Sequence, residues 1–332
     1  MLFRKLVLAN LFIASIVFNV AAQIKWERVD SDFGSLPTSV KLYRTADSIE
    51  GKPNIAYYVE ADLADKDLFF HTDTTLGRRL TPSQYFERSK SNNMIAGDPL
   101  VVVNTTFFSF ATHQNLNTVV NDGKLVSYNI HSFPGRGKDT LTYRHALASA
   151  IGIDKKGNAD VAWIFTDSSR RKPYAIQSSY PFFKDSIPDL SYKSIKRKLN
   201  SENIKLKKWK VKNSVGGGPV LVQNGEVRIT NNEEYRFAGK AIDDRHPRTA
   251  MGYTRDKKLI ILVVEGRNPG VAEGASLRHI AKMMKEVGCV EALNLDGGGS
   301  SCMLVNGKTT IKPSDKEAQQ RPVPAVFIIS KK

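Results

Sequence analysis

Short runs of β-branched and aromatic residues, separated by turn residues, recur along most of this chain and limit what it can fold into. Such runs occupy residues 100–108, 215–229, 249–267, 292–297 and 324–330, and Asn-Gly pairs such as Asn306-Gly307 punctuate them. Residues of these types favour strands, and Asn-Gly favours a tight hairpin turn. The pattern predicts a chain made mainly of short strands.

Only two stretches carry a helical pattern, residues 82–93 and 276–288. In the second stretch the apolar residues recur at helical spacing, Ser276 is a candidate cap and Gly288 is the stop. The apolar face consists of Leu277, Ile280, Ala281, Met284 and Val287. The predicted fold class is therefore α+β, as a single β-rich mixed α/β domain with few helices.

The first 22 residues have the composition of a secretory signal peptide. Arg4 and Lys5 precede an apolar run that ends at Val20, and Ala21 and Ala22 provide small residues for cleavage. The run is short for a membrane span of about 20 residues, which favours cleavage over a retained anchor. We expect an exported protein, periplasmic or extracellular, with no stable membrane span after signal removal. Residues 23–94 then form a segment that packs on a main domain at 95–332.

The chain is strongly basic, with 49 Lys and Arg against 33 Asp and Glu and a formal net charge of +16. An exported protein of this charge can meet anionic polymers, although the charge alone does not select one. Much of the excess positive charge lies at residues 192–212, where Glu202 is the only acid. A solvated insertion or strand face is favoured there over a dedicated binding stripe. Nucleic-acid motifs are absent, so no nucleic-acid partner is expected, and nothing indicates an oligomeric state.

The two cysteines, Cys289 and Cys302, stand in apolar strand-like surroundings. Their number excludes a fold built on disulfides, and the surroundings favour two buried thiols over a single bridge. Neither belongs to a C-x-x-C or His-flanked pattern, so neither a metal site nor thiol catalysis is expected. The nucleotide-binding glycine patterns also fail, because Cys302, or Leu221 for the pattern that begins at Gly216, stands where a glycine is needed. We expect no cofactor.

Residues 294–301, NLDGGGSS, combine a carboxylate, three glycines and two hydroxyls after an apolar run. Consecutive glycines let the backbone adopt unusual angles and let its N–H groups approach an anion closely. The hydroxyls of Ser300 and Ser301 add donors suited to phosphate or sugar oxygens. A tightly packed strand corner is the alternative, and glycine content alone does not decide between the two.

Polar residues also stand at the ends of other predicted strands. Asn104, Thr105 and Thr106 end one strand, Arg248 and Thr249 precede another, and Glu265 and Arg267 end the next. Burying such groups unpaired is costly, so they form structural ion pairs or belong to a site. Glu265 and Asp296 follow apolar runs of the same type. If these two strands are neighbours, the two acids share one edge of a sheet.

The segments VNTTFFS (103–109), VGGGPVLVQNGE (215–226) and 246–307 resemble the phosphodiester glycosidase domain family, in the same order along the chain. The resemblance covers about residues 95–330 and implies hydrolysis of a sugar phosphodiester. It implies a catalytic pair, Asp296 and Glu265. It further implies a substrate-binding set consisting of Asn104, Thr106, Gly217, Gly218, Arg248, Thr249, Arg267, Asn294, Gly297, Gly298, Gly299 and Ser300.

The chemistry of a sugar phosphodiester suggests a role for each charged group. Phosphate leaves readily, so holding its charge matters more than protonating it, which suits Arg248 and Arg267 together with the Gly297–Ser300 backbone. Asp296 and Glu265 are then the nucleophile or base and its partner. The substrate would be a sugar phosphate or phosphorylated glycan. The alternative is a non-catalytic binder of an anionic envelope or host polysaccharide. A phosphodiesterase or phosphatase is disfavoured because the sequence lacks a His- and Asp-rich metal cluster.

Overall fold

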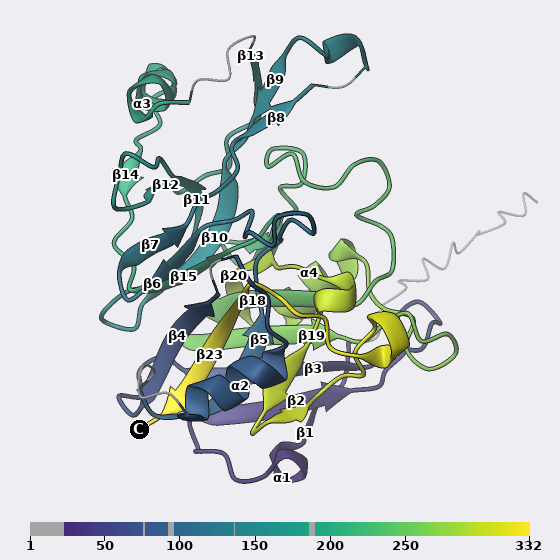
Figure 1. Ribbon diagram of the computed structural model, residues 1–332. Helices are drawn as coiled ribbons and strands as arrows, with labels where there is room; N and C mark the ends of the chain where they lie inside the picture. Colours follow the sequence, from purple (N-terminus) through teal and green to yellow (C-terminus); the bar gives the residue numbers. More distant parts are fainter. Residues whose placement is uncertain (1–22, 76, 92–95, 136, 186–189) are drawn as a thin grey trace, which may run out of the picture.

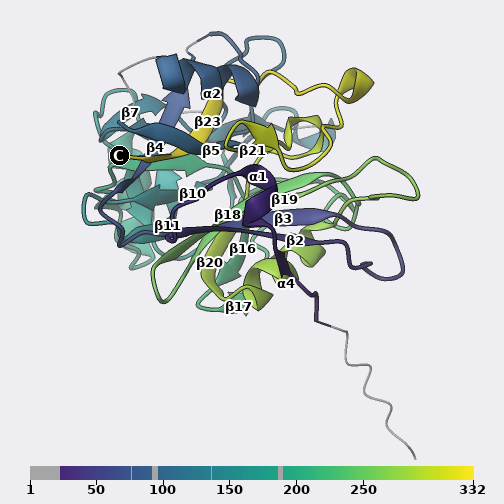
Figure 2. The same ribbon diagram turned by 90° about the horizontal axis from the view of Figure 1, so that it is seen from below.

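The computed structural model describes residues 23–75, 77–91, 96–135, 137–185 and 190–332, and these form four antiparallel sheets (Figures 1 and 2). The largest sheet has the order β1 (Glu27–Arg28), β2 (Val40–Thr45), β3 (Ala56–Asp62), β19 (Lys258–Val264), β18 (Arg248–Thr254), β20 (Cys289–Asn294), β16 (Val220–Gln223) and β17 (Glu226–Val227). A five-stranded sheet has the order β22 (Lys308–Thr309), β21 (Met303–Val305), β5 (Asp98–Asn104), β23 (Ala325–Lys331) and β4 (Leu68–Thr74).

The other two sheets lie towards the top of Figure 1. A seven-stranded sheet has the order β14 (Lys207–Lys208), β12 (Tyr174–Ile176), β11 (Ala159–Phe165), β10 (Ala148–Ile153), β15 (Asn213–Gly216), β6 (Val119–Asn121) and β7 (Lys124–Ser127). A small sheet of β13 (Phe183–Asp185), β9 (Tyr143–His145) and β8 (Ser132–Pro134) rises from it. The result is a mostly β, mixed α/β architecture with few helices, as the sequence pattern predicts.

Strand β19 contains an unbroken apolar run because both of its faces are buried. Leu259, Ile261 and Val263 point into the main core between the sheets, whereas the alternate residues Ile260, Leu262 and Val264 join a second core on the opposite face. Because side chains alternate along a strand, a strand covered on both faces must be apolar throughout. The second core also contains the apolar face of α4 (Leu277–Glu286), which covers the large sheet.

Helix α4 forms where the sequence predicts it, and Ser276 caps it. The Ser276 hydroxyl accepts a hydrogen bond from His279 N at 3.2 Å, and His279 Nδ1 accepts one from Ser276 N at 3.1 Å. Met283 is buried along with the predicted residues, whereas Val287 is only half-buried at the C-cap. Helix α2 (Pro82–Ser91) also matches its prediction, except that residues 92 and 93 lie outside the described part of the chain.

The lysine-rich segment contains a helix that the sequence pattern did not predict. Helix α3 (Tyr192–Ser201) buries Ile195 and Leu199, one helical turn apart, beneath an exposed basic face, and the edge strand β14 follows it. Two apolar residues among many lysines are too weak a signal for a helix prediction. The short helix α1 (Asp30–Phe33) was also not predicted.

The two Asn-Gly turns adopt the predicted hairpin geometry. Asn306 and Gly307 both have positive φ, 48° and 79°, between β21 and β22, and Asn224 and Gly225 do the same between β16 and β17. Both cysteines are buried free thiols, so the prediction of two thiols is confirmed and the bridge is excluded. Burial raises the pKa of both thiols.

The segment before residue 95 contributes strands to two sheets, since β3 pairs with β19 and β4 pairs with β23. Within the described residues, no helix combines the length and apolar character needed to cross a bilayer. The predicted signal peptide, residues 1–22, lies outside the described part of the chain.

Candidate active site

Three strands of the large sheet bring the candidate residues to one edge. β18 lies between β19 and β20 and is antiparallel to both, so β19 and β20 end at the edge where β18 begins. Glu265 directly follows β19, Asp296 lies two residues beyond β20, and Arg248 opens β18. The strands before the two acids are thus not neighbours, but the intervening strand places both acids at the same edge.

The glycine loop after β20 is held by main-chain hydrogen bonds. Asp296 N donates to Thr105 O at 2.8 Å, and Gly298 N donates to Pro247 O at 2.8 Å. Residues Gly298–Ser300 then form a short 3-10 turn. These bonds connect the loop both to the end of β5 and to the residue before β18, which fixes its position over the sheet edge.

Close neighbours explain why the loop needs three glycines. A Cβ on Gly297 would lie 2.9 Å from Pro247 O, and one on Gly298 would lie 2.9 Å from Arg267 Nη2. Gly298 also has a φ of +61°, and a Cβ on Gly299 would lie 2.3 Å from Arg321 Nη2. Two guanidinium groups therefore approach the bare backbone, which is an arrangement suited to an anionic ligand.

Asn104 holds the loop from beneath. Its Nδ2 donates to Asp296 O at 2.6 Å, and its Oδ1 accepts from Thr249 Oγ1 at 2.9 Å and from Cys302 N at 3.1 Å. The side chain is fully buried. Asn104 and Thr249 thus position the loop rather than face a ligand. Thr106 is bonded to Asn115, and none of its hydrogen bonds within the described chain reaches the glycine loop.

Asp296 is half-buried as a whole residue, and burial of its carboxyl raises the pKa from 3.8 to about 7. A side-chain hydrogen bond with Ser300 and the positive charge of Arg321 oppose this rise. Desolvation disfavours the charged form of a carboxyl, and here it outweighs both stabilising partners. At neutral pH the group is divided between its protonated and ionised forms, which suits an acid or base in catalysis.

Arg321 belongs to this site although the sequence analysis did not select it. Its Nε and Nη2 form a paired salt bridge with Asp315 at 3.0 and 2.9 Å, and Nη1 donates to Ser300 Oγ at 3.3 Å. The guanidinium also lies 5.2 Å from the ring centre of Phe110, which is 63% exposed. Arg321 stands in an irregular polar stretch, where no periodic pattern marks it.

Glu265 is buried, and it borders a small cavity of about 160 Å³. Its Oε1 accepts from Asn268 Nδ2 at 3.2 Å and its Oε2 from Lys312 N at 2.9 Å. The cavity is lined by Glu265, Gly266, Arg267, Asn268, Lys312, Pro313, Ser314, Asp315 and Ala318. Glu265 therefore shares this cavity with Arg267, which lies close to the glycine loop, and with Asp315, which pairs with Arg321.

The two arginines selected from the sequence occupy different surroundings. Arg248 is buried, and its Nε and Nη2 donate to Ala275 O at 2.9 Å and Asp244 O at 2.7 Å. Burial lowers its pKa to about 10. Arg267 is exposed, has a φ of +62°, and makes no side-chain hydrogen bond or ion pair with any described residue. Arg267 is therefore the more available of the two for a ligand.

The turn at Gly217 and Gly218 is joined to the end of β20. Asn294 Nδ2 donates to Gly218 O at 3.0 Å, and Gly218 N donates to Asn294 O at 2.8 Å. A Cβ on Gly217 would lie 2.3 Å from Asn294 O. Gly217, Gly218 and Asn294 thus form one rigid unit at the same sheet edge.

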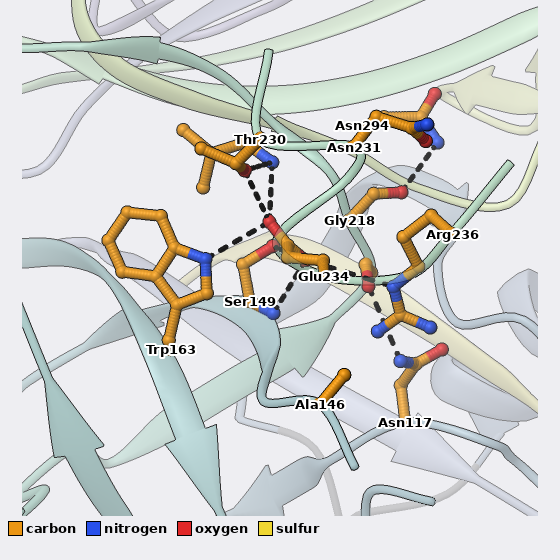
Figure 3. A network of polar contacts seen from close by, with 12 residues as sticks. Asn117, Ala146, Ser149, Trp163, Gly218, Thr230, Asn231, Glu234, Arg236 and Asn294 are labelled. Atoms are coloured by element: carbon orange, nitrogen blue, oxygen red, sulfur yellow. Dashed lines mark hydrogen bonds and ion pairs between the residues drawn. The ribbon is translucent and has the colours of Figure 1, made fainter. Parts of the chain in front are cut away.

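A buried carboxylate that the sequence analysis missed lies against this turn (Figure 3). Glu234 is 1% exposed and accepts five hydrogen bonds. The donors are Ser149 N (3.0 Å), Ser149 Oγ (2.9 Å), Trp163 Nε1 (3.1 Å), Val220 N (2.9 Å) and Thr230 Oγ1 (2.6 Å). Five donors stabilise a buried negative charge. Glu234 therefore joins β10, β11 and β16 beneath the turn.

Within the described chain, no group of three or more His, Cys, Asp or Glu side chains is arranged to hold a metal ion. The candidate chemical groups at this edge are Asp296, Glu265, Arg267, Arg321 and the glycine-loop backbone.

Comparison with known proteins shows what this part of the chain is similar to. Residues 184–330 match the family model described as phosphodiester glycosidase. N-acetylglucosamine-1-phosphodiester alpha-N-acetylglucosaminidase of Mus musculus is 30% identical over 103 residues, which are 29% of this chain and 20% of that protein. An uncharacterized prophage-derived protein of Bacillus subtilis is 32% identical over 104 residues, 31% of this chain and 15% of that protein. The chain thus spans about a fifth or less of the length of these curated relatives.

Solved structures share the fold. The catalytic domain of the zebrafish N-acetylglucosamine-1-phosphodiester alpha-N-acetylglucosaminidase aligns with a TM-score of 0.59 and 19% identity, over 90% of this chain and 85% of that chain. A putative exported protein of Burkholderia pseudomallei aligns with a TM-score of 0.53 and 16% identity, over 86% of this chain and 75% of that chain. The family-model match over residues 184–330 confirms the resemblance found in the sequence motifs, and the solved structures show that the fold is shared.

Proposed function

We propose that this protein is an exported glycosidase that hydrolyses the bond between a sugar and a phosphodiester. The single observation that carries the proposal is the setting of Asp296, a carboxyl with a pKa of about 7 in a glycine loop approached by the guanidinium groups of Arg267 and Arg321. Export is supported by the composition of residues 1–22 and by the likeness in fold to a protein described as exported.

In the proposed reaction, water replaces the phosphate at the anomeric carbon of the sugar. The bond from this carbon to the phosphate oxygen breaks, and the phosphate departs with the electron pair. Because phosphate is a good leaving group, cationic groups that hold its charge matter more than an acid that protonates it. Asp296 then acts in its ionised form, as nucleophile or as the base that activates water, with Glu265 as its partner across the site.

The direct test is release of free sugar from a sugar aryl phosphodiester, compared with a plain aryl glycoside of the same sugar and a plain aryl phosphate. Free sugar is the product to measure, because cleavage at the anomeric carbon leaves the aryl group on the phosphate. N-acetylglucosamine is the first sugar to try, because the curated relatives are named for it. We expect the phosphodiester to be hydrolysed much faster than either comparison substrate. Equal rates on the aryl phosphate would indicate a phosphatase instead. Failure to hydrolyse any of the three, together with binding to an anionic polysaccharide, would favour the binding function.

The Arg267→Met variant is expected to lose kcat/KM on the phosphodiester by about 10- to 100-fold, the equivalent of a charge-assisted hydrogen bond. The loss on the neutral aryl glycoside should be much smaller, because that substrate offers no phosphate. Arg267 makes no hydrogen bond or ion pair with another described residue, so its removal should leave the melting temperature nearly unchanged. Steady-state kinetics on both substrates measure the difference.

Arg197, an exposed arginine on α3, supplies the matched control. Arg197→Met removes the same charge from the surface, and screening limits its effect on the site. The assignment of Arg267 is wrong if the two variants lose the same amount of activity. Arg248→Met is a poorer test, because it also breaks the bonds to Ala275 and Asp244 and should lower stability.

A further inference from the structure

Arg236 is a largely buried arginine whose guanidinium lacks hydrogen bonds. Its side chain is 13% exposed, and its Nε lies 3.7 Å from Glu234 Oε2, which is too far for a hydrogen bond. Within the described chain none of its guanidinium nitrogens donates to any acceptor, and Nε is fully buried without a partner. Buried polar groups in folded proteins nearly always have a hydrogen-bond partner, so the buried Nε of Arg236 needs an explanation.

Glu234 does not satisfy Arg236, because its two oxygens already accept five other hydrogen bonds (Figure 3). It provides a countercharge that holds the guanidinium in place and leaves the N–H groups free. The contrast with the neighbouring arginines is clear. Arg248 donates to two carbonyl oxygens, and Arg321 donates to Asp315 and Ser300.

Arg236 borders a cavity of about 530 Å³ with aromatic walls. The lining residues are Phe133, Pro134, Gly135, Arg144, Phe182, Asn231, Asn232, Tyr235, Arg236, Phe237, Ala238 and Gly239. The outer wall comes from β8 and β9, which belong to the small sheet at the top of Figure 1. A volume of this size falls in the range of sites for small ligands.

The cavity adjoins the candidate active site through two phenylalanines. Arg248, at the start of β18, lies 6.0 Å from the ring centre of Phe237, which lines the cavity. Phe107 packs edge-on against Phe237 at 6.1 Å and also lies 6.0 Å from the Arg236 guanidinium. A ligand that spans both places would therefore have one end at the sheet edge and the other beside Arg236.

We propose that this cavity is a subsite for a second, acidic sugar unit of the substrate, whose phosphate or carboxylate group pairs with the Arg236 guanidinium. Sugar rings present apolar faces that pack on aromatic side chains, and Phe182, Tyr235 and Phe237 provide such surfaces. The anionic group would supply the hydrogen bonds that Arg236 lacks. This inference rests on the proposed function, and it extends the substrate from a single sugar phosphodiester to an anionic glycan.

The test measures binding rather than turnover. Glucose 6-phosphate, glucuronic acid and glucose are titrated by calorimetry into the whole protein and into Arg236→Met. We expect at least one of the two acidic sugars to bind the unsubstituted protein at least about tenfold more tightly than glucose, the effect of a charge-assisted hydrogen bond. Arg236→Met should remove that preference, and Arg197→Met should keep it. The acidic sugar that shows the preference tells whether phosphate or carboxylate is the preferred partner.

Removing Arg236 leaves Glu234 without its countercharge, so Arg236→Met could fail to fold. Arg236→Lys keeps the charge and the fold, but an ammonium cannot donate two parallel N–H bonds to one anionic group. We expect it to keep only part of the preference for the acidic sugar. The proposal is overturned if the folded protein binds both acidic sugars no better than glucose, or if Arg236→Lys or a folded Arg236→Met keeps the full preference. Hydrolysis of a simple phosphodiester would be unaffected by that outcome, so the proposed function would stand.

Discussion

Asp296→Asn is expected to lower kcat on a sugar phosphodiester by a factor on the order of 100 or more, within the range for lost acid–base or nucleophilic chemistry. Asparagine has nearly the same shape, but it can neither take up a proton nor attack the anomeric carbon. The loop should persist, since Asn104 and Thr105 hold Asp296 through its backbone. Steady-state kinetics measure the loss of kcat, and circular dichroism and the melting temperature show whether the variant keeps its fold.

Asp315→Asn is the matched control, because Asp315 is a nearby acid with a structural partner. Its carboxylate pairs with Arg321, which holds its pKa below the ordinary value. Losing this pair should loosen Arg321 and lower kcat by much less than the loss of Asp296. Wild-type turnover by a folded Asp296→Asn variant would remove the enzyme hypothesis in this form. It would favour a protein that binds glycans without cleaving them.

The pH dependence tests the form in which Asp296 acts. If the carboxylate is the active form, kcat should rise with pH through about 7 and then level off, in line with the raised pKa of this group. The stability of the folded protein is expected to change with pH in the opposite direction to kcat. Because folding raises the pKa of Asp296 above 3.8, the protonated form is favoured in the folded protein, and its contribution is lost as pH rises from about 4 towards 7. A kcat that instead falls through pH 7 would assign Asp296 as an acid.

The sequence predicts several of the strands and the glycine loop because their signals are local. The apolar run of β19, the Asn306-Gly307 turn and the Ser276 cap each depend on residues close together in the chain. The order of the strands is not local. The sequence does not show whether the strands before Glu265 and Asp296 are neighbours, and in the structure β18 lies between them.

The site residues that the sequence did not predict have their roles only because of tertiary packing. Arg321 stands 25 residues after Asp296 in an irregular stretch, and Glu234 and Arg236 stand in a long loop between β17 and β18. Neither stretch has a periodic pattern. Conversely, Arg248 and Arg267 look alike in the sequence, and only their partners distinguish a buried structural arginine from an exposed free one.

Gly218→Ala is expected to destabilise the protein by about 3 kcal/mol or more, from backbone strain together with overpacking. Gly218 has a φ of +116°, and an added Cβ would lie 2.3 Å from Glu234 Oε2 and 2.9 Å from Arg236 Nε. Glu234 cannot move aside, because five hydrogen bonds fix its carboxylate. The added methyl group should therefore disturb the turn, the buried carboxylate of Glu234 and the Arg236 guanidinium together.

Gly225→Ala separates the clash from the strain. Gly225 also has a positive φ, +78°, but an added Cβ would meet nothing within 4 Å. Its expected cost is about 1 kcal/mol, from backbone strain alone. Urea denaturation of both variants gives the two free energies of unfolding. A difference well above about 1 kcal/mol reflects the Glu234 contact together with the greater strain at a φ of +116°, since Gly225 has no close neighbour. Equal losses would mean that Glu234 moves freely, and the view of a rigid buried network beneath the turn would then be wrong.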